Sequence, residues 1–154
     1  MQANPAGVIY GTIMVGTLLA AESARRETYA RTVAGVAIAM LLLWLVRAYT
    51  RFTGQRLRES TPLEASGLVR TMVEELAIML GAVPPLVALA ICWAAGASLN
   101  TAVEAGVWDS AAVILVIEVI AGIRANLRGF ALILQTAFGA LLGLLIIALR
   151  LLLH

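Results

Sequence analysis

Four polar side chains that are candidates for chemical roles lie inside or beside long apolar runs of the sequence. They are Arg47, Glu75, Glu118 and Gln135. Glu118 is the clearest case, because aliphatic residues stand directly before and after it. Ionisable groups in an apolar, membrane-like environment are costly to bury, and they therefore indicate a functional site by default. A carboxylate and a guanidinium in such a place can form an ion pair or respond to protons and ions.

Helical spacing predicts that these side chains share one depth. Glu118 precedes Arg124 by six residues, which is about 9 Å of helical rise, and Gln135 follows Gly129 by six residues. Arg47 lies one turn before Arg51. We therefore expect one buried polar layer of Arg47, Glu118 and Gln135, with Glu75 nearby. Three interpretations stay open: a structural clamp, a proton- or ion-responsive site, or an Arg47 that reaches the headgroups and leaves Glu118 protonated.

The chain has no recognisable catalytic motif. It lacks G-x-S-x-G, a Walker loop and H-E-x-x-H, and it holds one cysteine, Cys92, and one histidine, His154. We expect no enzyme activity, no cofactor and no metal site. All eleven basic residues are arginine, but they form no run of the kind that binds nucleic acid.

The composition indicates a membrane protein. Of 154 residues, 62% are hydrophobic and 13% are charged, whereas soluble domains have about 45–50% apolar and about 25% charged residues. Long apolar runs predict an all-α, polytopic transmembrane helix bundle in a single domain, since open strands leave backbone groups unpaired in lipid. The predicted spans are about 5–21, 32–52, 76–99, 107–124 and 129–150. The alternative is four spans with a re-entrant or interfacial helix, because the first and fourth segments give the weakest signals.

An amphipathic segment is predicted at about 61–75. Thr61, Pro62 and Glu64 have the spacing of a capping box with proline at the first helical position, and apolar residues follow at helical intervals. The segment is expected to be either a helix on the membrane surface or a plain extension of the third span.

Two small-xxx-small pairs predict close helix packing: Gly7 with Gly11, and Gly139 with Gly143. Such pairs serve contacts within one chain or between copies. Pro84 and Pro85 in the third span predict a kink, either as a simple bend or with freed carbonyls that face a polar cavity.

The arginines predict an orientation. Five spans place seven of them on the side of the N-terminus and four on the other, which favours a cytoplasmic N-terminus in a bacterial inner membrane. Arg150 and His154 are expected to form an interfacial end of the last span.

Short motifs along the chain resemble a group of small bacterial integral membrane proteins of about five spans, common in actinobacteria. They are residues 10–13 (YGTI), 44–49 (WLVRAY), Glu75 followed by Pro84–Pro85, and 143–150 (GLLIIALR) with His154. The resemblance implies membrane location and span number, and no activity. Members of that group carry histidine at the position of Arg47, so this chain lacks a group there that titrates near neutral pH.

Two functions are expected from these patterns. The first is an oligomeric channel- or transporter-like module with the Glu118 layer near its path. The second is an accessory or scaffolding subunit of a larger membrane complex, with that layer as a clamp. The expected partners are the lipid bilayer and either further copies of the chain or another membrane protein.

Overall fold

The computed structural model describes residues 5–21, 28–59 and 65–153, and every regular element in these ranges is an α-helix. The helices are α1 (Pro5–Ala21), α2 (Tyr29–Glu59), α3 (Ala65–Glu74), α4 (Ala77–Ala94), α5 (Leu99–Arg124) and α6 (Phe130–Leu153). The all-α bundle predicted from the apolar runs is therefore what the chain forms. The capping box at residues 61–64 lies outside the described residues.

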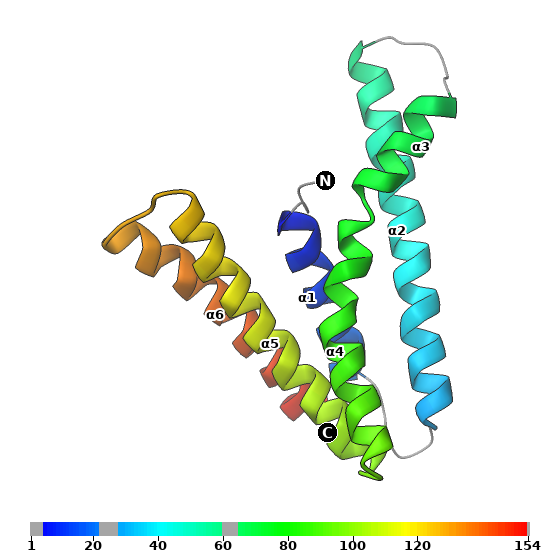
Figure 1. Ribbon diagram of the computed structural model, residues 1–154, viewed down its shortest axis with the longest axis vertical. Coiled ribbons are helices and arrows are strands. Elements are labelled where there is room, and N and C mark those ends of the chain that lie inside the picture. The colour runs from blue at the N-terminus through cyan, green and yellow to red at the C-terminus, as the bar shows by residue number, and fades with distance from the viewer. Residues whose placement is uncertain (1–4, 22–27, 60–64, 154) are drawn as a thin grey trace.

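Successive long helices run alternately up and down in Figure 1. The start of α1, the end of α2, the whole of α3 and the end of α5 lie toward one end of the molecule, and the end of α6 lies toward the other. The α5–α6 pair leans away from α2 and α4 toward the end that carries α3 (Figure 1). The molecule thus has two arms that diverge at one end.

Four helical segments are long and apolar enough to cross a membrane: Tyr29–Leu57, Ser66–Ala94, Leu99–Arg124 and Phe130–Leu153. The second of these combines α3 and α4. Helix α1 is also apolar but has 17 residues, the lower limit of the roughly 17–25 that cross a hydrocarbon core.

Helix α5 begins eight residues earlier than the sequence predicted, at Leu99 instead of about residue 107. The reason is a side-chain cap, because the Ser98 hydroxyl accepts a hydrogen bond from the Thr101 amide at 3.2 Å. Such caps satisfy an amide at the first turn that has no intrahelical partner. Glu104, which the predicted spans leave in a connection, therefore belongs to the helix.

Helix α1 is the centre of the bundle, in contact with α2, α4, α5 and α6. Its buried positions are mainly small residues with a few aliphatic ones: Gly7, Gly11, Thr12, Val15, Gly16, Leu19 and Ala20. Small side chains let neighbouring backbones approach closely, which supplies dispersion contacts where lipid tails offer no hydrophobic advantage. The sequence signal of this segment is weak because a helix buried among other helices needs small residues, which are less apolar than the large aliphatic residues of a lipid-facing helix.

Both small-xxx-small pairs lie at contacts within the chain. A Cβ at Gly7 would be 2.9 Å from the Cβ of Ala77, and a Cβ at Gly11 would collide with the Ile78 carbonyl, so this pair joins α1 to α4. A Cβ at Gly139 would be 2.6 Å from Glu118 Cγ, and one at Gly143 would be 3.1 Å from Ala111 Cβ. The second pair therefore joins α6 to α5.

Candidate functional site

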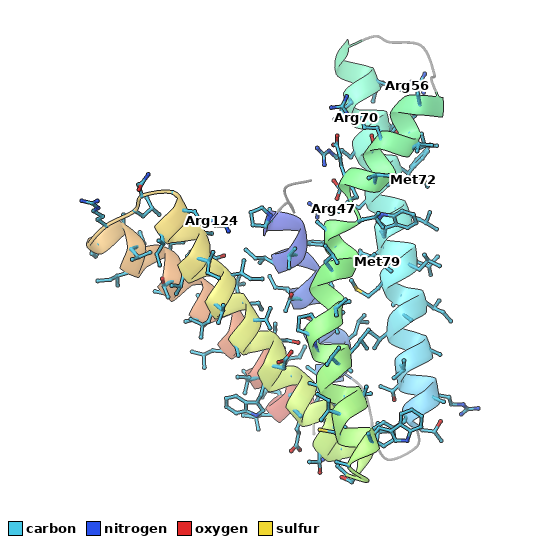
Figure 2. All side chains as sticks on the ribbon, in the orientation of Figure 1. Arg47, Arg56, Arg70, Met72, Met79 and Arg124 are labelled. Carbon is cyan, nitrogen blue, oxygen red and sulfur yellow. The ribbon has the colours of Figure 1, made fainter. Side chains whose placement is uncertain are left out.

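The structure divides the predicted polar layer into two separate groups. Arg47 pairs with Glu75, whereas Glu118 pairs with Gln135. The two groups lie on different arms, since α2 packs against α1, α3 and α4, whereas α6 packs against α5 and α1. Figure 2 shows Arg47 on one arm and Arg124, at the end of α5, on the other. Counting residues along each helix predicted similar depths for Arg47 and Glu118, but it could not predict that the two side chains lie on different sides of the bundle.

Glu75 lies at the break between α3 and α4. The helix tightens there, with Leu76 N–H donating to Val73 O at 3.3 Å and Ile78 N–H to Glu75 O at 3.1 Å. These are contacts between residues three apart, which replace the four-apart ladder of an α-helix. The chain thus changes direction at Glu75, and the amphipathic segment forms a helix of its own, α3, instead of a straight extension of α4.

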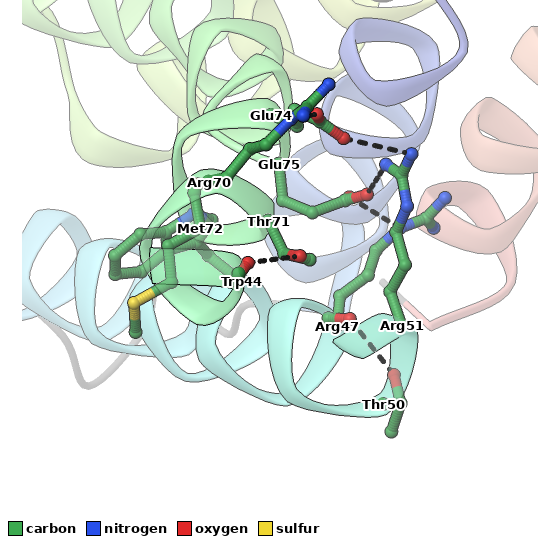
Figure 3. Close-up of polar contacts among 10 residues, drawn as sticks. Trp44, Arg47, Thr50, Arg51, Arg70, Thr71, Met72, Glu74 and Glu75 are labelled. Carbon is green, nitrogen blue, oxygen red and sulfur yellow. Dashed lines mark hydrogen bonds and ion pairs between the residues drawn. The ribbon is translucent and has the colours of Figure 1, made fainter. Parts of the chain in front are cut away.

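The Glu75 side chain is only 2% exposed and is held by two arginines of α2. Arg47 Nε donates to Glu75 Oε2 at 3.0 Å, and Arg51 donates through a terminal nitrogen to Glu75 Oε1. Both carboxylate oxygens are therefore engaged (Figure 3). A buried carboxylate needs this pairing, because an isolated charge in such a place costs several kcal/mol.

A second carboxylate extends the ion pairs outward. Arg51 also meets Glu74 Oε2 at 3.2 Å, and Arg70 Nε meets Glu74 Oε1 at 3.1 Å. The network, which we call the Glu75 cluster, consists of Arg47, Arg51, Arg70, Glu74 and Glu75 (Figure 3). It carries three positive and two negative charges, hence a surplus of one positive charge.

Two contacts fix α3 against α2 and so hold the cluster in place. The Trp44 indole N–H donates to the Met72 carbonyl at 3.0 Å. Gly67 lies close to Phe52, since a Cβ there would be 3.3 Å from the Phe52 ring. Trp44, Arg47 and Arg51 recur at intervals of three and four residues, so one face of α2 presents all three to α3 and Glu75.

An open groove of about 740 Å³ adjoins the cluster. Its lining combines one face of α2 with Tyr10 of α1 and the carboxylate at the α3–α4 break: Tyr10, Leu43, Val46, Arg47, Thr50, Arg51, Gly54, Gln55 and Glu75. The Arg47 guanidinium lies 4.3 Å from the centre of the Tyr10 ring, a cation–π arrangement. The groove volume falls within the roughly 300–1,000 Å³ of small-molecule sites.

The second polar group is smaller. Gln135 Nε2 donates to Glu118 Oε2 at 3.0 Å across α5 and α6. Both side chains are half-buried. Gly139 leaves the space that the Glu118 side chain occupies. This pair joins two helices, but it lies apart from the groove.

Pro85 frees a backbone carbonyl that α1 then satisfies. Proline has no amide hydrogen, so the Gly81 carbonyl, four residues earlier, receives no intrahelical donor from position 85. The Thr12 hydroxyl instead donates to Gly81 O at 3.0 Å, with Thr12 fully buried. Pro84 and Pro85 both lie inside α4. At Pro85 the freed carbonyl thus binds a neighbouring helix, not a polar cavity.

Two features of the polar contacts were not predicted from the sequence. Arg51 and Glu74 belong to the Glu75 cluster; the four-residue spacing of Arg47 and Arg51, which puts them on one helix face, is the signal that could have paired them. Arg150 is buried within the protein and donates to Asn100 Oδ1 at 2.6 Å. Within residues 5–21, 28–59 and 65–153, no three His, Cys, Asp or Glu side chains gather as a metal site would require.

Comparisons with known proteins add no relative: no protein-family model, curated protein or solved structure matches the chain. The functional argument therefore depends on the geometry of the Glu75 cluster and its groove.

Proposed function

We propose that the chain is a non-enzymatic, channel- or transporter-like membrane protein whose working site is the groove beside the Glu75 cluster. The observation that carries this is the buried Glu75 carboxylate, which lies where α3 and α4 break and holds two arginines that line an open groove. Discontinuous helices form the binding sites of many transporters. The surplus positive charge favours an anionic solute.

The proposed setting is a bacterial inner membrane with the N-terminus in the cytoplasm. Arg47, Arg56, Arg70 and Arg124 gather toward one end of the molecule, the end at which α1 begins (Figure 2). Arginine-rich connections favour the cytoplasmic side. The apolar outward surfaces of α2 and α6 are compatible with contact to lipid.

We further propose that the working unit is an oligomer. Four segments long enough to cross a membrane, together with the shorter α1, are few for a transporter. The half-buried Glu118–Gln135 pair lies on the arm that diverges from α2 and α4. A polar pair facing lipid is costly, and a second copy against α5 and α6 would remove that cost.

The test is flux of protons, potassium and small anions in proteoliposomes. Wild type is compared with Glu75→Gln, which keeps the shape and removes the charge, and with Glu74→Gln, the matched control on the adjacent, more exposed carboxylate. We expect flux in wild type and near-normal flux in the Glu74 variant. We expect loss of most flux in the Glu75 variant, because two arginines without the Glu75 charge would hold an anion too tightly to release it. Folded wild-type protein without flux contradicts the proposal, as does undiminished flux in the Glu75 variant.

The second candidate is an accessory subunit of a membrane complex. It is favoured by the same Glu118–Gln135 pair, which a helix of another protein would cover as well as a second copy would. Purification from native membranes distinguishes the two. A stoichiometric partner that is lost in a Glu118→Leu variant, together with absent flux, supports the subunit.

A further inference from the structure

The groove has a polar half and an apolar half along one face of α2. Its α2 residues recur every three or four positions, from Leu43 and Val46 through Arg47, Thr50 and Arg51 to Gln55. Residues at this spacing form a continuous stripe on one helix face, here about 18 Å long. The apolar residues come first, toward the middle of the helix, and the polar ones lie toward the end near α3.

The polar half retains hydrogen-bond donors for an anion. Each guanidinium has five N–H donors. In the part of the chain that the structure describes, the ion pairs of the Glu75 cluster use Nε of Arg47 and the two terminal nitrogens of Arg51. Both side chains are more than a third exposed, whereas Glu75 is 2% exposed behind them. The two guanidiniums thus supply most of the exposed charged surface of the groove, and the buried Glu75 carboxylate contributes little of it.

These observations fit a particular ligand chemistry, and we infer that the groove binds an anionic, phosphate-bearing amphiphile. The phosphate lies against Arg47 and Arg51, and the apolar chain follows Leu43 and Val46. Guanidiniums bind phosphate oxygens through paired N–H donors. Two guanidiniums one helical turn apart suit a phosphate, which presents more acceptor oxygens than a carboxylate does. This inference rests on the groove of the proposed function and not on flux.

The charged residues that line the groove allow a test in which two variants should change anion binding in opposite directions. The groove lining carries two arginines and one glutamate, a surplus of one positive charge. Removing the Glu75 charge raises this surplus, whereas removing the Arg51 charge cancels it. Glu75→Gln should therefore tighten binding of the anion, although it lowers the stability of the folded protein. Arg51→Gln should weaken binding about tenfold, as expected for the loss of one charged hydrogen-bond partner.

The measurement is the shift of the thermal unfolding midpoint of detergent-solubilised full-length protein. The probes are dihexanoyl phosphatidate, dihexanoyl phosphatidylcholine and inorganic phosphate, each titrated so that the concentration dependence gives an apparent Kd. The variants are Glu75→Gln, Arg51→Gln and Arg70→Gln. Arg70 is the matched control, because it belongs to the cluster but does not line the groove.

We expect phosphatidate to raise the midpoint of wild type and of the Arg70 variant more than either other probe does. Equal shifts with inorganic phosphate would overturn the amphiphile, and equal shifts with phosphatidylcholine would overturn the anion site. If the cluster has only a structural role, both Glu75→Gln and Arg51→Gln should lower the unfolding midpoint without changing its shift on addition of phosphatidate. That result would also overturn the inference. Binding without flux would leave the inference standing and refute only the proposed transport.

Discussion

At the scale of single residues, Thr12 and Pro85 explain how a proline lies inside a packed helix of this bundle. The Gly81 carbonyl that Pro85 leaves without an intrahelical donor accepts the Thr12 hydroxyl of α1. The same hydroxyl lies 3.0 Å from Val8 O in its own helix. A buried carbonyl without a partner costs about 1–3 kcal/mol, so Thr12 makes the proline compatible with burial.

Thr12→Val should therefore lower the free energy of unfolding by about 1–2 kcal/mol, because it keeps the shape but removes the donor. The measurement is chemical unfolding in detergent. Thr17→Val is the matched control, since within the described ranges the Thr17 hydroxyl donates only to Ile13 O of its own helix, and it should have a much smaller effect. In a Pro85→Ala background, which restores the amide donor, the cost of Thr12→Val should fall. Equal costs for Thr12 and Thr17 would refute this role.

At the scale of elements, α1 and α4 are joined by an interface of backbone against backbone. Gly11 lies against the Ile78 carbonyl, and Gly81 lies against the Val8 carbonyl. The sequence predicted close packing at Gly7 and Gly11, because spacing by four residues puts both on one helix face. It could not identify α4 as the partner, since many small residues in the chain offer similar faces.

Gly11→Ala should separate these helices and destabilise the protein by about 1–3 kcal/mol or more, as overpacking does. Gly35→Ala is the control, because no other described part of the molecule lies within 4 Å of a Cβ at that position of α2. Alanine there should be neutral or slightly stabilising, given its higher helix propensity. Thermal unfolding midpoints compare the two variants, and a tolerated Gly11→Ala would contradict the interface.

Element boundaries show what local sequence determines. The apolar runs predicted the helices well, because length and hydropathy decide membrane helices almost alone. The start of α5 was misplaced because Asn100, Thr101 and Glu104 gave the segment a loop-like composition, whereas the Ser98 cap begins the helix before them. The α3–α4 break at Glu75 is a tertiary effect, since two arginines from α2 hold the carboxylate there.

At the scale of the whole molecule, divergence of the two arms separates the charges that the sequence had brought together. Counting residues along a helix gives height, and Arg47 and Glu118 have similar predicted heights. Lateral position depends on which helices pack against each other, and α2 packs against α1, α3 and α4. Arg47 therefore meets Glu75 across α2 and the α3–α4 break, and Glu118 meets Gln135 across α5 and α6.

The most direct test of this arrangement is a pair of double-mutant cycles on unfolding free energy in detergent. One cycle combines Arg47→Gln with Glu75→Gln, and the other combines Arg47→Gln with Glu118→Gln. We predict a coupling energy of about 1–3 kcal/mol in the first cycle and within about 0.5 kcal/mol of zero in the second, as for contacting and distant pairs. Coupling of Arg47 to Glu118 that equals or exceeds its coupling to Glu75 would contradict the account.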